Sequence, residues 1–228
     1  MNNIPIDLNR GRKFYKSTFA NISEDKRRHI LETAIREFAS KGYDGTNINV
    51  VAKKAGISVG SMYKYFESKE DLFLMIIDIC MQVLEDTINK VIESDDSIMS
   101  KVERIFREIQ RTSRESKDLI CLYNEMTTIG NKDIVERISR DIESISAKAY
   151  TNLISNGQLS GEIRSDIDPR MAAFFLDNLF MSLQFSYSCD YYQERFRTYC
   201  GEDIEKRDDF VIDELCKLIK SAFCPSDT

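Results

Sequence analysis

Apolar residues recur at intervals of three and four along most of this chain, and short polar or glycine-containing breaks interrupt the pattern. This spacing is typical of helices that bury one face. Only nine glycines and three prolines occur in 228 residues, which also favours helix. The sequence therefore predicts an all-α protein, with two short helices between residues 47 and 66 and longer ones at about 23–40, 68–93, 98–115, 117–129, 169–189 and 209–223. Another long helix is expected to start at Asn131 and to end at Gly157 and Gly161.

The stretch from Asn47 to Leu72 has the most specific pattern: helix, tight turn, helix, cap, helix. Gly56 stands where the turn needs positive φ, and Ala52 is small enough for two helices to approach. Ser58 is a suitable N-cap, and Ser68 begins the next helix. The residues spaced to fill the small core are Val51, Ala55, Ile57, Met62 and Phe66. The pattern predicts a helix-turn-helix whose second helix enters the DNA major groove; the alternative is an ordinary helical hairpin.

From Arg28 to Phe73 the chain resembles the DNA-binding domain of the TetR family of bacterial transcriptional regulators. Two positions depart from the common pattern of that family. Val59 stands where Lys, Pro or Arg is frequent, and Lys64 stands where His is frequent, which bears on the operator sequence rather than the class. The matching residues are Ile30, Leu31, Ala34, Phe38, Gly42, Tyr43, Thr46, Val51, Ala52, Ala55, Gly56, Ile57, Ser58, the run Gly60 to Phe66, Lys69, Glu70 and Leu72.

The resemblance implies an N-terminal three-helix DNA-binding domain and a C-terminal helical domain for ligand binding and dimerisation. We expect a flexible basic arm over residues 1–22, the helix-turn-helix domain over 23–70 and the regulatory domain over 71–228. The arm is either a loose leader or a segment that reaches DNA phosphate or the minor groove.

The second helix of the motif supplies most of the candidate DNA-binding residues. Val59, Gly60, Ser61, Tyr63 and Lys64 fall on or near its exposed side, after Ser58. By resemblance, the segment Tyr63–Tyr65 contacts phosphates and bases, although Tyr65 has packing against the first helix as its alternative role. Phosphate contacts are also expected from Thr46 or Asn47 and from Lys69, through helix N-termini and charge.

The charge distribution supports contact with nucleic acid at one end only. The net charge of −6 argues against nucleic acid when it is taken alone. Residues 1–70, however, carry 13 basic and 8 acidic side chains, a net charge of +5, whereas residues 71–228 carry 19 and 30, a net charge of −11. A basic end on an acidic body fits a protein that meets phosphate through that end.

The candidate chemistry excludes several other classes of function. The six cysteines form no C-x-x-C pair and the single histidine is His29, so we expect no metal site, no cofactor and no catalytic residues. Scattered cysteines indicate reduced thiols in a cytoplasmic protein, with redox sensing by Cys189 or Cys200 as an alternative. No apolar run reaches the length of a membrane span, so we expect no membrane partner.

The C-terminal domain is expected to hold an effector and a second copy of the chain. The stretch 171–189 is apolar almost all round, so the helices at 169–189 and 209–223 are expected to pair in a homodimer. We predict a ligand-responsive regulator, most simply a repressor that binds a palindromic operator in double-stranded DNA; the alternatives are a helical interaction protein and a redox-responsive regulator. Candidate residues for a small, largely apolar effector are Phe106, Tyr123, Met126, Phe175, Asn178, Met181 and Gln184.

Overall fold

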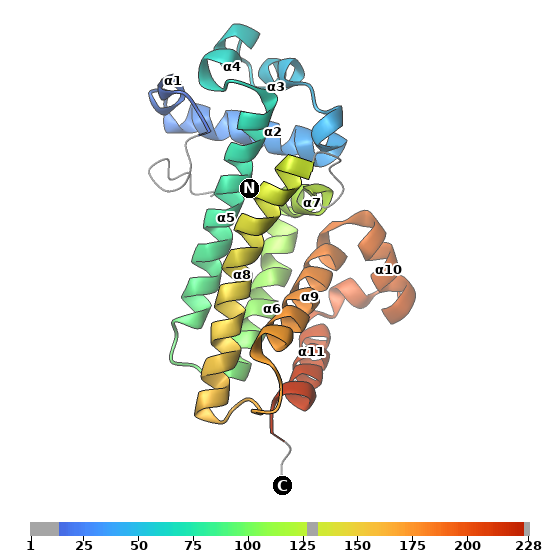
Figure 1. Ribbon diagram of the computed structural model, residues 1–228. Helices are drawn as coiled ribbons and strands as arrows, with labels where there is room; N and C mark the ends of the chain where they lie inside the picture. Colours follow the sequence, from blue (N-terminus) through green and yellow to red (C-terminus); the bar gives the residue numbers. More distant parts are fainter. Residues whose placement is uncertain (1–13, 127–131, 226–228) are drawn as a thin grey trace. The chain divides into compact units, whose positions relative to one another are not determined.

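The computed structural model describes residues 14–126 and 132–225. Between residues 132 and 142 it describes the backbone, and Arg140 is the one residue whose side chain it also describes. The described residues are helical apart from short connections (Figure 1), which confirms the predicted fold class. The helices are α1 (Ser17–Ala20), α2 (Glu24–Gly45), α3 (Ile48–Lys54), α4 (Val59–Tyr65), α5 (Lys69–Ile92), α6 (Ile98–Glu115), α7 (Lys117–Met126), α8 (Lys132–Ser160), α9 (Pro169–Ser188), α10 (Asp190–Cys200), the 3-10 turn η1 (Ile204–Lys206) and α11 (Asp208–Phe223).

The chain divides into two compact units. Unit 1 contains the residues up to Leu84 together with Cys121–Ile138, and unit 2 contains Glu85–Ile120 and the residues from Ser139 onward. The division lies inside α5, beyond the domain boundary predicted at residue 70. The reason is that the first turns of α5 belong to the core around α2: Phe73 is fully buried, with its ring centroid 5.1 Å from that of Phe38.

The core of unit 1 forms on one face of α2. The predicted apolar stripe is confirmed, because Ile30, Ala34, Ile35 and Phe38 are each at most 1% exposed. Gly42 has φ of 68°, which interrupts the helical conformation close to the predicted end of this helix.

The structure differs from the prediction of a flexible arm over residues 14–22. α1 lies in this stretch, and Phe19 is fully buried, with its ring centroid 4.8 Å from that of Phe66. Phe14 and Tyr15 precede Phe19 in this stretch, but a helix of four residues is too short to show the repeated apolar spacing that predicts the longer helices. The remaining part of the predicted arm, with Arg10, Arg12 and Lys13, lies outside the described residues.

In unit 2, α6 packs against α9, and Val102, Ile105 and Phe106 are buried as their spacing predicts. Asp168 caps α9 by accepting hydrogen bonds from the backbone N–H groups of Arg170 and Met171 at 2.9 and 3.0 Å, and Pro169 follows as predicted.

The sequence predicts that Gly157 and Gly161 end α8. The helix continues past Gly157 to Ser160, and Gly161 adopts φ of 81° directly after it. Gly157 has a different role, because a Cβ atom there would lie only 2.5 Å from Cγ1 of Ile163. The glycine allows the following turn to fold back onto the helix.

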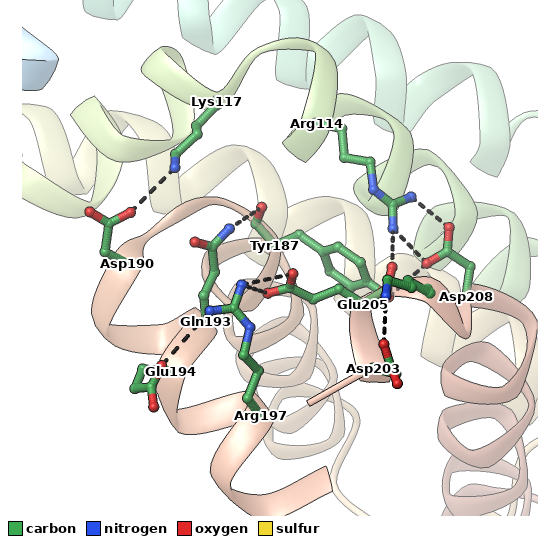
Figure 2. A network of polar contacts seen from close by, with 11 residues as sticks. Arg114, Lys117, Tyr187, Asp190, Gln193, Glu194, Arg197, Asp203, Glu205 and Asp208 are labelled. Carbon is green, nitrogen blue, oxygen red and sulfur yellow. Dashed lines mark hydrogen bonds and ion pairs between the residues drawn. The ribbon is translucent and has the colours of Figure 1, made fainter. Parts of the chain in front are cut away.

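Polar side chains join α6 to the C-terminal helices of unit 2 (Figure 2). The guanidinium of Arg114 donates to both carboxylate oxygens of Asp208, at 2.5 and 2.6 Å, and Tyr187 donates its hydroxyl to the same carboxylate at 3.0 Å. These hydrogen bonds, that of Arg114 first, lower the pKa of Asp208. Nearby, Arg197 of α10 donates to both oxygens of Glu205. The network fixes the stretch 190–208, which the sequence predicts only as a connection with some helix.

Within the described residues, no helix combines the length and the hydropathy needed to cross a membrane.

Candidate DNA-binding site

The turn between α3 and α4 has the geometry that the sequence predicts. Gly56 adopts φ of 67°. Its N–H donates to the carbonyl of Lys53 at 3.2 Å, and the N–H of Ile57 donates to the carbonyl of Ala52 at 3.0 Å. These two bonds form a Schellman motif, which satisfies the last carbonyls of α3. No atom lies within 4 Å of a Cβ placed on Gly56, so the backbone angle rather than space requires glycine here.

α4 starts at its predicted cap and has two distinct faces. Ser58 accepts a hydrogen bond from the N–H of Ser61 at 3.0 Å. The inner face is buried: Met62 and Phe66 are 0% exposed, and they join Val51 and Ala55 in the predicted core, while Ile57 is half-buried. The outer face carries the exposed residues Val59, Gly60, Tyr63 and Lys64.

Tyr65 belongs to the inner side of α4. It is 8% exposed, and its ring centroid lies 5.7 Å from that of Phe19. The packing role, one of the two that the sequence leaves open, is therefore the one that the structure describes for its ring. The aromatic partner, Phe19, belongs to α1, whereas the sequence predicts packing against the helix at 23–40, which is α2.

The three candidates outside α4 are held in different ways. Asn47 is exposed and caps α3 by accepting from the N–H of Asn49 at 2.9 Å. Thr46 is buried, and its hydroxyl donates to the carbonyl of Gly42 at 2.7 Å. The ammonium of Lys69 donates to the carbonyl of Tyr43 at 2.7 Å and lies 4.4 Å from the centroid of its ring. Of the three, only Asn47 presents an exposed side chain.

Glu37 is a residue of this site that the sequence analysis misses. It is 5% exposed on α2, accepts a hydrogen bond from Lys41 at 2.9 Å and forms an ion pair with Lys54 of α3. The hydrogen bonds from Lys54 and Lys41 lower the pKa of its carboxyl group. The spacing of Glu37 and Lys41 signals a helical pair, but nothing local signals Lys54. The ion pair fixes α3 on α2 and neutralises part of the charge of α3.

Lys53 of α3 and Lys64 of α4 are exposed. Unlike Lys54, neither forms an ion pair with another residue in the described part of the chain. Around the turn, the motif therefore leaves one cation on each helix available to a phosphate.

The seven candidate effector residues do not share one environment. Phe106 is fully buried, Met126 is 7% exposed, and Tyr123, Met181 and Gln184 are half-buried. Phe175 is 53% exposed, and Asn178 is exposed with its amide donating to the carbonyl of Phe174 at 2.7 Å. Tyr123 and Met126 belong to unit 1, whereas the other five belong to unit 2.

Phe106 belongs to an aromatic cluster in unit 2 that also contains Phe180 and Tyr150, and of the three only Phe106 is among the candidates from the sequence. The ring centroid of Phe180 lies 4.9 Å from that of Phe106 and 5.1 Å from that of Tyr150. Burial raises the pKa of Tyr150 well above its ordinary value. Asp177 lies on α9, the helix that also carries Phe180. Desolvation raises the pKa of the Asp177 carboxyl group to about 6, with a smaller contribution from Glu143.

The six cysteines are free thiols. Burial raises the pKa of the Cys80 thiol to about 12, which disfavours the reactive thiolate. Of the two candidate sensors, Cys189 is buried and Cys200 is exposed at the end of α10.

Residues 30–76 match the family described as "Bacterial regulatory proteins, tetR family". The chain is 28% identical over 166 residues to the uncharacterized HTH-type transcriptional regulator YhgD of Bacillus subtilis, a match that covers 73% of this chain and 86% of YhgD. It is 28% identical over 153 residues to the HTH-type transcriptional repressor DhaR of Mycobacterium sp., covering 66% of this chain and 76% of DhaR.

The fold has a counterpart among solved structures. The transcriptional regulator FadR from Bacillus subtilis, crystallised in complex with stearoyl-CoA, superposes with a TM-score of 0.66 at 18% identity, over 83% of this chain and 97% of FadR. The helix-turn-helix geometry of α3 and α4 and the family match that spans it identify residues 30–76 as a DNA-binding domain of the tetR family, and the regulators that resemble the chain support a TetR family transcriptional regulator.

Proposed function

We propose that this regulator is a cytoplasmic repressor that binds a palindromic operator as a homodimer and responds to a small, largely apolar effector. The observation that carries the DNA-binding part is the division of α4 into a buried face and an exposed one. Met62 and Phe66 fix the helix to the core, and Tyr63 and Lys64 are left outward beside Gly60. Such a helix enters the major groove with its outer side chains on base edges and phosphates.

The outer residues of α4 suit different contacts. Gly60 has no side chain, so the backbone can approach the DNA closely. Lys64 offers three N–H donors to a phosphate or to a guanine edge, and Tyr63 offers a ring and a hydroxyl. Ser58 and Ser61 bond to each other through their hydroxyls at 2.8 Å, and either hydroxyl can also reach a phosphate at the start of the helix.

Titration of labelled DNA fragments from the gene neighbourhood tests this proposal. At moderate salt, we expect at least one fragment to bind much more tightly than random DNA, and we expect Lys64→Ala to weaken that binding. Lys148→Ala is the matched control, because Lys148 is an exposed lysine on α8 in unit 2. Binding no tighter than to random DNA would remove the proposal in favour of a helical interaction protein.

Exposed apolar side chains on α9 and α11 support the homodimer. Phe174 and Phe175 are 59% and 53% exposed, Met171 precedes them by one helical turn, and Leu218 on α11 is 54% exposed. Large apolar side chains grouped in this way mark an interface when they belong to one patch. A second copy is the occupant we propose, because isologous pairing covers the same patch on both subunits.

A charge on this surface tests the homodimer. Phe175→Glu or Leu218→Glu is expected to convert a dimer into a monomer in sedimentation at micromolar concentration, because pairing would bury the new charge. Glu214→Gln is the control, since Glu214 is exposed on α11 and loses a charge rather than gaining one. A wild-type monomer at that concentration contradicts the proposal.

The proposed effector is a small, largely apolar molecule. The aromatic cluster of Phe106, Tyr150 and Phe180 supplies apolar surface in unit 2, and an apolar wall with a few polar groups suits an apolar ligand. The stearoyl-CoA bound by FadR makes long-chain acyl compounds a reasonable first set to test. Release of operator DNA on addition of such a compound supports this part, whereas release only on treatment with an oxidant favours redox control through Cys200.

A further inference from the structure

The last backbone carbonyls of α4 are bonded to a segment that lies outside the helix-turn-helix. The N–H of Lys16 donates to the carbonyl of Tyr65 at 2.8 Å, and the ammonium of Lys16 donates to the carbonyl of Tyr63 at 3.0 Å. The hydroxyl of Thr18 donates to the carbonyl of Lys64, the residue between them. Three consecutive carbonyls of α4 are thus satisfied by two residues at the start of α1.

These carbonyls belong to the end of a helix that has few bonds of its own. α4 has seven residues, and an isolated helix of that length is unstable in water. The last four carbonyls of any helix lack partners within it. In α4, Phe66 N–H supplies the partner of Met62 at 2.9 Å, and the other three partners come from Lys16 and Thr18. The cation of Lys16 is also favourable at a helix C-terminus.

An aromatic contact fixes the same segment. Phe19 is fully buried, and its ring contacts both Tyr65 and Phe66 at the end of α4. On the other side, the guanidinium of Arg27 on α2 donates to the carbonyls of Ala20 and Ile22, at 2.8 and 2.5 Å. α1 is therefore held between α2 and α4, at the place where Figure 1 shows it beside α4.

From these contacts we infer that Lys16, Thr18 and Phe19 form a clasp that positions the recognition helix α4 for DNA. This inference rests on the proposed DNA-binding function. The clasp acts on the end of α4 that carries Tyr63 and Lys64, so it fixes the direction of the side chains that would meet the operator. Lys16, Thr18 and Phe19 are positioning residues, and the DNA-binding role belongs to α4.

Thr18→Val is the sharpest test, because valine keeps the shape of threonine and removes the hydroxyl donor to the Lys64 carbonyl. Thr18→Ser keeps the donor and is the matched control. One hydrogen bond corresponds to a change of about twofold to tenfold in an equilibrium constant. We expect Thr18→Val to lower affinity for the operator by that factor, to speed hydrogen exchange of the α4 amides, and to leave the salt dependence of binding unchanged. Thr18→Ser should restore the wild-type values.

Phe19→Leu provides a second variant that keeps an apolar side chain and removes the ring contacts. We expect Phe19→Leu to lower the affinity for the operator by a larger factor than it lowers the affinity for random DNA. Wild-type exchange and wild-type operator affinity in both Thr18→Val and Phe19→Leu would overturn the inference. A different result would overturn the proposed function: a wild-type protein that binds operator and random DNA equally well. The inference about DNA binding would then be overturned too, even if Thr18→Val speeds hydrogen exchange of the α4 amides.

Discussion

Different kinds of contact stabilise the helix-turn-helix part of unit 1 and the C-terminal helices of unit 2. Around α3 and α4, helix caps, a Schellman turn and fully buried side chains such as Met62 and Phe66 make the structure. In unit 2, charged side chains join helices that are distant in the sequence, as Arg114 does with Asp208 and Arg107 does with Asp209 (Figure 2 shows the first).

This difference bears on what each unit can do. The small core of the helix-turn-helix leaves Lys53 and Lys64 without an ion pair among the described residues, so their charges are available to a phosphate. In unit 2, the named arginines are already paired with carboxylates of the same unit. Screening by salt should therefore weaken the links within unit 2 and the binding of DNA, and should leave the apolar core of α3 and α4 almost unchanged.

The largest expected effect comes from emptying the core beside α4. Phe66→Ala removes a fully buried ring and should lower the free energy of unfolding by about 3–5 kcal/mol, measured by thermal or denaturant unfolding. Tyr63→Ala, at a 43% exposed position on the other face of α4, should change the stability by less than about 0.5 kcal/mol. Equal losses in the two variants would contradict the two faces assigned to α4.

A smaller effect is expected from Asp177, a partly buried carboxyl group in unit 2. Its folded pKa of about 6 lies above the ordinary value of 3.8, so the folded state binds the proton more tightly than the unfolded state. The stability that this group contributes is therefore complete below about pH 4 and is lost as the pH rises through 6. Asp177→Asn should raise the free energy of unfolding at pH 7.5 by about 1–3 kcal/mol and change it little at pH 4.

The control for Asp177 is Asp213→Asn, at an exposed position on α11. The difference between the two variants at each pH gives the effect that is specific to Asp177. A pH-independent effect of Asp177→Asn would show that desolvation does not govern this carboxyl group.

The smallest effect is expected from the ion pair between α6 and α11. Arg114→Met should lower the free energy of unfolding by about 1 kcal/mol, because both partners are more than a third exposed and solvent screens them. The loss should shrink in 1 M salt and also as the pH falls through the lowered pKa of Asp208, where the carboxylate is protonated. Arg111→Met, which breaks pairs within α6 only, should cost less than Arg114→Met. The reverse order would contradict the role of long-range pairs in unit 2.

The sequence predicts the helix-turn-helix well because its signals are local. Gly56, Ser58 and the spacing of Val51, Met62 and Phe66 act within a few residues of one another, and the structure confirms each of them. Contacts that join distant segments leave no such signal. Neither the bond from Thr18 to the Lys64 carbonyl nor the pair of Arg114 with Asp208 follows from periodicity, since each partner alone looks like an ordinary surface residue.

The candidate site shows the same limit at the level of single residues. Lys64 and Lys69 look equivalent in the sequence, as lysines near the two ends of one predicted turn. In the structure, Lys64 is exposed, whereas the ammonium of Lys69 donates to the carbonyl of Tyr43 and lies over its ring. Only the three-dimensional arrangement separates them, and that separation is open to a direct test.

The salt dependence of operator binding tests the central claim, that the exposed face of α4 contacts DNA. Binding constants for wild type, Lys64→Ala and Lys69→Ala are measured by fluorescence anisotropy on one operator duplex over a range of salt concentrations. If Lys64 neutralises a phosphate, Lys64→Ala should lower the slope of log K against log salt by about 1 for each protomer bound. Lys69→Ala should change the slope less than Lys64→Ala does, since the hydrogen bond to the Tyr43 carbonyl fixes the position of its ammonium. An unchanged affinity and slope in Lys64→Ala would contradict the claim.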